Sequence, residues 1–285
     1  MPRPLPSFAS PPVTEVVISS RYKYVPTYSL LTIADLARTA ASNGFVVIEE
    51  RPGYDAPTER FGASVASSQV SLEILSGPPP TRYWFLNPVG DELLQLQPNW
   101  VAANWRKVAP TADYGRWDSR WSAFSTWVES VETSLTEGNS ELQHDQVEVT
   151  YVNHIETKGV WQDHSDASRV FSFLANLDQR TDGFLSEPEQ TTTELQFVIP
   201  DPTDSSLPLG RLHVAVTPGF KRPTNEPIFL MNLTARGRPT SSDLQGVRAF
   251  AELGHEWIVR AFADLTTPEM HLAWERNDTS EGEEA

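Results

Sequence analysis

Six histidines are the side chains of this sequence best suited to acid–base or metal chemistry near neutral pH. His255 and Glu256 begin like the zinc-protease helix motif HExxH, but Val259 stands where the second histidine belongs. Since zinc on a helix face needs two imidazoles one turn apart, this motif is incomplete. The sequence also has no cysteine, which excludes disulfides and zinc sites built on sulfur. We therefore assign no metal site.

A second group of polar side chains lies near the middle of the sequence. It consists of His154, Glu156, Asp163, His164 and Asp166. The spacing matches no metal motif, and loops collect Asp, Ser and His because these side chains satisfy the backbone of turns. Two interpretations stay open, a turn-forming segment and the acid–base site of an unrecognised hydrolase. The sequence contains no GxSxG, P-loop or GxGxxG motif, so we predict no catalytic residue and no cofactor.

Amides and a guanidinium group between residues 95 and 106 indicate binding rather than catalysis. Gln95 and Gln97 are two residues apart and so share one face of a strand. Because amides and arginine form directional hydrogen bonds, we predict that this stretch lines a recognition surface, with the strand end YVNHIE as its counterpart in the second half. The alternative is a sheet face whose polar side chains are merely solvated. The predicted binding residues are Gln95, Gln97, Asn99, Asn104, Arg106, Asn153 and His154.

Residues 13–140 must supply the elements that position these side chains. Alternating apolar residues predict strands at 13–24, 45–50, 70–75, 82–86 and 92–97, and helical spacing predicts helices at 30–41 and 114–135. Residues 51–61 are expected to form a polar, proline-containing loop. The second helix carries one bulky stripe, which we expect to lie across a sheet. Its members are Trp117, Trp121, Phe124, Val128, Val131 and Leu135.

Residues 141–275 repeat this order of elements. The patterns predict strands at 146–156, 194–199, 211–217 and 228–234, and helices at 168–177 and 243–265, followed by a short helix to residue 275. Residues 1–12 are a proline-rich segment, and 276–285 an acidic, disordered tail. We predict an α+β fold of two tandem strand–helix–antiparallel strands–long helix halves. They would form a pseudo-twofold, curved antiparallel sheet with helices on one face, like that of the TATA-box-binding protein.

The net charge of −16, from 38 acidic and 22 basic side chains, disfavours general binding to nucleic acid. No apolar run approaches the length of a membrane span, and the N-terminal residues lack the apolar core of a signal peptide. We therefore expect a cytoplasmic protein. The composition leaves open whether the chain forms a homo-oligomer.

Four segments spread along the chain carry a resemblance to known proteins. They are PPVTEVVISSRY at 11–22, YWFLNPVGDELLQLQPNWVAANWRK at 83–107, VTYVNHIE at 149–156 and GHEWIVRAFADLTTPEMHLAW at 254–274. With its QLQ…NWR and C-terminal HEW…LTTPEMH…W motifs, the sequence resembles a sporadically distributed prokaryotic family that has only a numbered label and no established activity. Such patchy distribution is typical of mobile or defence-associated genes. The resemblance thus implies an antitoxin-like or phage-defence accessory role, and it assigns no catalytic residue.

Three functions follow from these observations. The first is a non-enzymatic protein-binding module whose partner is encoded by a neighbouring gene. The second is a small-molecule sensor with a pocket between the sheet and the helix of Trp117 and Trp121, in which Gln95, Gln97 and Arg106 would supply the polar contacts. The third is the hydrolase built on the group around His154.

Overall fold

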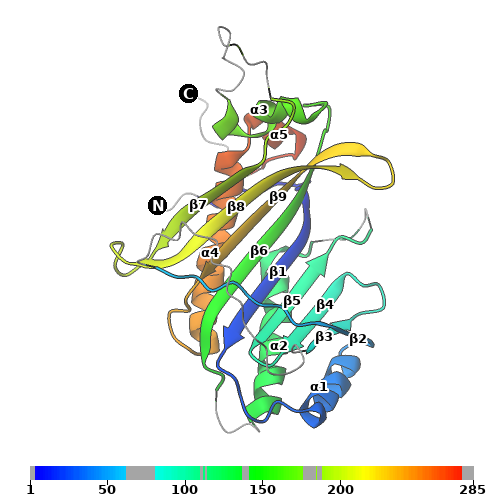
Figure 1. Cartoon of the computed structure of the whole chain (residues 1–285), viewed down its shortest axis with the longest axis vertical. Helices are drawn as coiled ribbons and strands as arrows, with labels where there is room; N and C mark the ends of the chain where they lie inside the picture. The colour runs from blue at the N-terminus through cyan, green and yellow to red at the C-terminus, as the bar shows by residue number, and fades with distance from the viewer. Residues whose placement is uncertain are drawn as a thin grey trace.

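The computed structural model describes residues 4–61, 81–109, 112, 114–136, 141–175, 184 and 188–277. These residues form one nine-stranded antiparallel sheet in the order β2-β3-β4-β5-β1-β6-β9-β8-β7, with helices packed against it (Figure 1). The predicted α+β class is confirmed. The strands are β1 (Val13–Tyr22), β2 (Val47–Pro52), β3 (Thr81–Leu86), β4 (Glu92–Gln97), β5 (Trp100–Arg106), β6 (His144–Glu156), β7 (Thr193–Pro200), β8 (Pro208–Lys221) and β9 (Glu226–Gly237). The α-helices are α1 (Leu30–Ser42), α2 (Arg116–Thr136), α3 (Ala167–Val170), α4 (Leu244–Leu265) and α5 (Pro268–Ala273).

The two halves of the chain meet at the centre of the sheet, where β1 pairs with β6. On its other side β1 pairs with β5, and β6 pairs with β9. β2 and β7 form the two outer edges. In each half the first strand therefore lies at the centre of the sheet and the last strand lies beside it. The remaining strands follow outward in reverse order along the chain.

The long helices α2 and α4 lie on the same face of the sheet, behind the strands in Figure 1. From Phe124 onward the apolar stripe of α2 is buried against the sheet. Trp117 and Trp121, which begin the stripe, are only partly buried because they meet α4 instead. Trp117 stacks on His255 with 4.3 Å between ring centres, and Arg248 lies 5.9 Å from the ring centre of Trp121. The stripe thus joins the two long helices as well as helix and sheet.

Helix α4 approaches the sheet closely because glycines lie beneath it. Gly210 and Gly237 are direct cross-strand partners on β8 and β9, and the buried ring of Phe250 occupies the space that their side chains would need. Asp243 caps the helix as predicted, with its carboxylate accepting a hydrogen bond from the Gly246 N–H at 2.8 Å. The helix is therefore fixed both at its start and on its sheet face.

Several predicted boundaries differ from the structure. β8 and β9 extend beyond 211–217 and 228–234 and form a long hairpin. Of the helix expected at 168–177, the described residues form α3 and a short 3₁₀ turn at Ser172–Leu174, interrupted because Phe171 is extended and its ring is buried in the core. The strand expected at 70–75 lies outside the described residues, as does all of the tail beyond Asn277.

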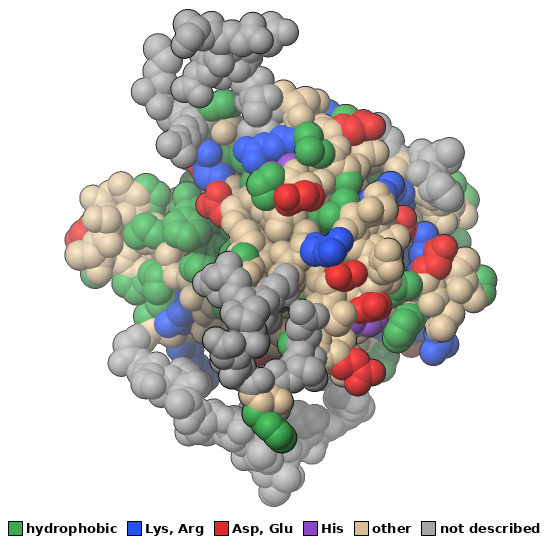
Figure 2. Space-filling view, turned by 90° about the horizontal axis from the view of Figure 1, so that it is seen from above, with side chains coloured by type: hydrophobic (Ala, Val, Ile, Leu, Met, Phe, Trp, Pro, Cys, Tyr) green, Lys and Arg blue, Asp and Glu red, His purple; other side chains and the backbone are tan. Residues whose placement is uncertain are grey.

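Charged side chains of both signs are mixed on the end of the molecule that carries α3 and α5 (Figure 2). The net charge of −16 is therefore not gathered into one acidic patch on this end. Within the described residues, none of the helices is both long and apolar enough to cross a membrane.

Candidate functional site

The face of the sheet turned away from α2 and α4, here called the open face, carries a continuous row of polar and aromatic side chains. Residues paired directly across neighbouring strands point to the same side of a sheet. Successive partners in this row are Gln97, Trp100, Arg21 and Gln146, from β4, β5, β1 and β6. The row therefore crosses the junction between the two halves of the chain.

Three of the predicted binding residues lie beside this row on the open face. Gln95 Nε2 donates a hydrogen bond to Asn104 Oδ1 at 2.6 Å, and Asn104 Nδ2 donates to Glu15 Oε1 at 2.8 Å. Arg106 Nη2 donates to the carbonyl oxygen of Gly90 at 2.9 Å. Gln95 and Asn104 are both buried. These side chains form an ordered polar layer rather than a freely solvated surface.

Three other predicted binding residues are separated from this layer. Asn99 lies in the turn between β4 and β5, where its carbonyl accepts a hydrogen bond from the Tyr22 N–H. Asn153 points to the helix face and donates to the Met231 carbonyl at 3.1 Å. His154, the next residue, points to the opposite side because successive side chains of a strand alternate. Asn153 and His154 therefore cannot contribute to one surface.

Residues 53–61, here called the strap, cross the open face above the row of cross-strand partners (Figure 1). Gln97, the seventh predicted binding residue, uses both ends of its amide on the strap. Its Oε1 accepts a hydrogen bond from the Tyr54 N–H at 3.0 Å, and its Nε2 donates to the Tyr54 carbonyl at 2.7 Å. Gln146 repeats this pattern, accepting from the Glu59 N–H and donating to the Pro57 carbonyl, both at 2.8 Å. Sequence reasoning predicted a loop here and missed these contacts.

Glu59 is held at the far end of the strap by three basic side chains, here called the carboxylate socket. Its Oε1 pairs with Arg211, its Oε2 lies 2.8 Å from Nε2 of His213, and Arg236 lies 4.0 Å away. Burial on its own raises the pKa of the Glu59 carboxyl, but the hydrogen bonds and charges of His213 and Arg211 outweigh burial and lower the pKa. The side chain is only 7% exposed, so the socket holds a nearly buried carboxylate.

Three arginines surround Trp84 on the open face, close to the start of the strap. The guanidinium carbons of Arg51, Arg82 and Arg106 lie 4.7, 5.4 and 6.0 Å from its ring centre. Arg82 also lies 5.6 Å from the ring centre of Tyr54, and burial lowers its pKa. Tryptophan and arginine are the residues that most often dominate the affinity of protein interfaces. This cluster was not predicted, because only the folded sheet brings β2, β3 and β5 together.

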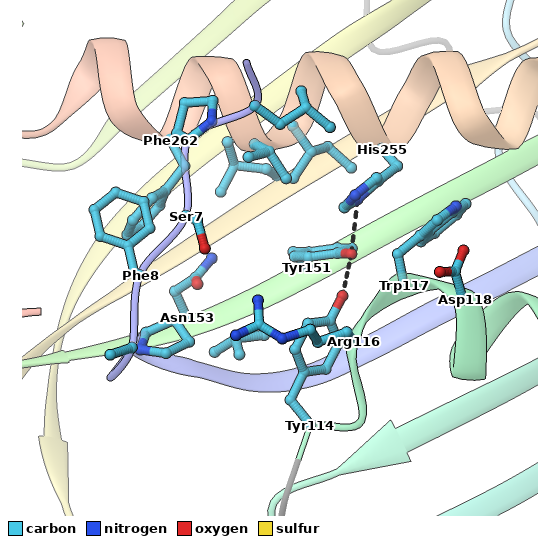
Figure 3. A pocket seen from close by; sticks show the side chains of 18 residues that line it. Ser7, Phe8, Tyr114, Arg116, Trp117, Asp118, Tyr151, Asn153, His255 and Phe262 are labelled. Carbon is cyan, nitrogen blue, oxygen red and sulfur yellow. Dashed lines mark hydrogen bonds between the residues drawn. The ribbon is translucent and has the colours of Figure 1, made fainter. Parts of the chain in front are cut away.

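A pocket of about 460 Å³ opens on the helix face, between α4, β6, the start of α2 and the N-terminal segment (Figure 3). Phe8 and Phe262 line one side and Trp117 another. Of the two tryptophans expected to line the predicted pocket, Trp117 lines it and Trp121 does not. Arg106 and the two predicted glutamines lie on the opposite face of the sheet and contribute nothing to it.

A chain of hydrogen bonds links the polar side chains of this pocket (Figure 3). The hydroxyl groups of Tyr114 and Tyr151 share a hydrogen bond, and the Tyr151 oxygen lies 2.9 Å from Nδ1 of His255. Burial raises the pKa of Tyr114 to about 12 and lowers the pKa of His255 to about 4. At neutral pH the two tyrosines and His255 therefore present uncharged hydrogen-bonding groups, while the basic Arg116 and the acidic Asp118 also line the pocket.

The polar residues between 154 and 166 do not converge on one point. Nε2 of His164 lies 3.1 Å from the carbonyl oxygens of Gly219 and Ile228, and Asp163 caps the short helical turn that follows it. Among the residues that the structure describes, no three His, Cys, Asp or Glu side chains are placed to hold a metal ion. These contacts agree with the turn-forming interpretation of the segment.

The candidate sites are therefore the open face with its strap and the pocket of Figure 3. The resemblance to a sporadically distributed prokaryotic family stays a prediction. No model of a known protein family, no curated protein and no solved structure matches this chain.

Proposed function

We propose that this chain is a non-enzymatic protein-binding module and that the open face is its binding surface. The observation that carries the proposal is the strap, because the open face already accommodates an extended polypeptide through the amides of Gln97 and Gln146. An amide that pairs with both a main-chain N–H and a carbonyl binds polypeptide whatever its side chains.

The cluster around Trp84 is the proposed energetic centre of this surface. Trp84 and Arg106 are partly exposed and Arg51 is exposed, so a partner can reach them without moving the core. A partner that covers the cluster would shield an aromatic ring and three cations from water, which is the composition of known interface hot spots.

Trp84→Ala is expected to weaken binding of the cognate partner at least tenfold, or about 1.4 kcal/mol. The loss follows from removing the ring that the three guanidinium groups contact. Isothermal titration calorimetry of the native chain and the variant, against the purified products of the genes flanking its own, measures the effect. Trp257→Ala is the matched control, because Trp257 is also partly buried but lies on α4 at the helix face.

Equal losses for the Trp84 and Trp257 variants would place the partner elsewhere and reject the open face. Absence of any binding by the native chain at micromolar concentration would count against the module itself. The biological setting that we propose with this function is an antitoxin-like or phage-defence accessory role in the cytoplasm, which the family resemblance supports.

We also propose that the two halves are copies of one unit, related by a pseudo-twofold axis as in the TATA-box-binding protein. The order of the strands supports this proposal. In each half a central first strand lies beside the last strand, and a long helix follows that last strand. The open face would then be a composite of two equivalent surfaces, with the row from Gln97 to Gln146 crossing the axis.

A second candidate function is the binding of a small molecule in the pocket of Figure 3. Its size and its mainly apolar walls fit a ligand site, and the perturbed pKa of His255 marks it as unusual. Arg116 forms no ion pair with any described residue, and its φ of 58° is rare for a residue with a side chain. A flat apolar molecule whose acidic group lies beside Arg116 and away from Asp118 fits these features.

Trp117→Ala is expected to weaken binding of the fluorescent aromatic sulfonate 8-anilinonaphthalene-1-sulfonate about tenfold, because one pocket wall is lost. Arg116→Met should weaken it by a similar factor through loss of the charge. Trp121→Ala is the control, since Trp121 lies on the same helix outside the pocket. A fluorescence titration in which all three variants bind alike would exclude this pocket as the site.

A further inference from the structure

We infer that the strap is a displaceable stand-in for the partner: the open face binds an extended segment of another protein that carries an acidic side chain, and the strap occupies the same contacts in the free chain. This inference rests on the proposed function and adds to it the class of partner and the way binding is controlled.

Gln97 and Gln146 hold the strap through its main chain, and the side chains of Tyr54, Thr58, Glu59 and Phe61 add further contacts. The amides of Gln97 and Gln146 contact Tyr54, Pro57 and Glu59 only at backbone atoms. A partner segment with a different sequence can form the same four hydrogen bonds, provided that it is extended. These positions therefore select an extended polypeptide and leave its composition open.

The carboxylate socket supplies the selectivity that the amides lack. Arg211 and His213 converge on one nearly buried carboxylate, in a chain whose net charge is −16, and Arg236, which pairs closely with Glu148, lies 4.0 Å from it. Arg211 Nη1 also donates to the Arg60 carbonyl at 2.8 Å, which fixes the direction of the segment beside the carboxylate. A partner segment therefore needs Glu or Asp where the strap has Glu59.

The strap is also built to come away from the sheet. It crosses the strands and shares no strand pairing with them, and Asp55, Pro57, Thr58 and Arg60 are exposed. A segment outside the strand pairing opens at a lower free-energy cost than the core, although opening the strap also breaks the ion pairs of the nearly buried Glu59. Because the strap is tethered, its local concentration is roughly millimolar, so it lowers the apparent affinity of a partner without abolishing binding.

The test uses a labelled peptide with the strap sequence, GYDAPTERF, and a chain in which residues 53–61 are replaced by an equal number of Gly and Ser residues. Fluorescence anisotropy is expected to show the peptide binding the strap-replaced chain at least tenfold more tightly than the native chain. Equal affinity for the two chains, or no binding to either, would overturn the inference.

Two controls distinguish binding in the carboxylate socket from non-specific binding of the peptide. In the strap-replaced chain, Arg211→Ala should weaken peptide binding at least tenfold, and so should glutamine in the peptide at the place of Glu59. If the strap-replaced chain fails to fold, Glu59→Gln in the full chain takes its place and is expected to admit the peptide several-fold better than the native chain does. Asp55→Asn is its matched control, because Asp55 is exposed and should leave peptide affinity unchanged.

The inference and the proposed function can fail separately. Suppose that a flanking-gene product binds with equal affinity to native and strap-replaced chains, and the peptide binds neither. The chain is then a protein-binding module as proposed, but the strap does not occupy the partner's site. If the peptide binds the strap-replaced chain while no flanking-gene product binds either chain, the open face binds extended peptides as inferred, but the proposed partner is wrong. If the native chain is a dimer and strap replacement converts it to a monomer, the occupant of the open face is a second copy of the chain. That result would overturn the inference that the open face binds a segment of another protein.

Discussion

Replacing Gly237 by alanine is expected to lower the free energy of unfolding by about 3 kcal/mol or more. A Cβ atom there would lie 2.4 Å from a ring carbon of Phe250 and 2.5 Å from the carbonyl oxygen of Leu209. The carbonyl belongs to the sheet backbone and cannot give way, so the ring and α4 must move. Since α4 also carries His255, the variant should distort the pocket of Figure 3 as well.

Gly219→Ala is the matched control for this prediction. Gly219 lies on β8, the strand that pairs with the one carrying Gly237, but a Cβ there would meet its nearest neighbour, Leu230, at an ordinary 3.5 Å. Its unfolding free energy should stay within about 1 kcal/mol of the native value, since alanine also restricts the unfolded chain. Urea denaturation at pH 7 compares the two variants. Equal stabilities would mean that α4 does not rest on the glycine pair as described.

Lowering the pH from 6.5 to 5 is expected to remove about 3 kcal/mol of stability, shared equally between two histidines. Burial lowers the pKa of His144 and of His255 to about 4 from an ordinary value of 6.5, and the nearby carboxylates only partly oppose this. Between these pH values the unfolded chain binds protons that the folded chain excludes. Stability is therefore full above pH 6.5 and declines as the pH falls towards 4.

The histidine effect can be separated from that of the acidic side chains. Glu59, whose folded pKa is lowered from 4.5, loses its stabilising contribution only below about pH 4.5. Urea midpoints measured between pH 7 and 5 thus report mainly the histidines. In the double variant His144→Gln, His255→Gln the pH dependence in this range should become clearly smaller, even though the variant is less stable at pH 7. His154, whose pKa burial also lowers, accounts for part of the remainder. An unchanged slope would show that neither imidazole is buried in its neutral form.

Local patterns predicted most of the sheet, because period-two alternation marks a strand with one buried face. β4 occupies 92–97 as predicted. The apolar stripes of the two long helices predicted these helices equally well. The pattern failed at 168–177, where helical spacing exists but burial of Phe171 decides the backbone. It also left out β5, WVAANWR, which becomes evident as a strand only from its pairing with β1 and β4.

The candidate site was only half accessible from the sequence. The shared face of Gln95 and Gln97 follows from their spacing, whereas the separation of Asn153 from His154 follows from the same rule and was overlooked. The strap could not be foreseen. Its residues carry no periodicity, and its partners Gln146 and Arg211 lie far along the chain and depend on strand register. The only available signal was the isolated pair Arg211 and His213, two residues apart on one strand face.

The long sequence separation within the strap's contacts has a consequence for synthesis on the ribosome. Glu59 and Arg211 are 152 residues apart, so the socket does not exist when Glu59 leaves the exit tunnel. At roughly 5–20 residues per second, the wait lasts on the order of ten seconds or longer. During that interval the first half can present its share of the open face with the Glu59 end of the strap unanchored. A partner translated from an adjacent gene on the same messenger RNA would therefore meet this chain before the strap is fixed across the open face.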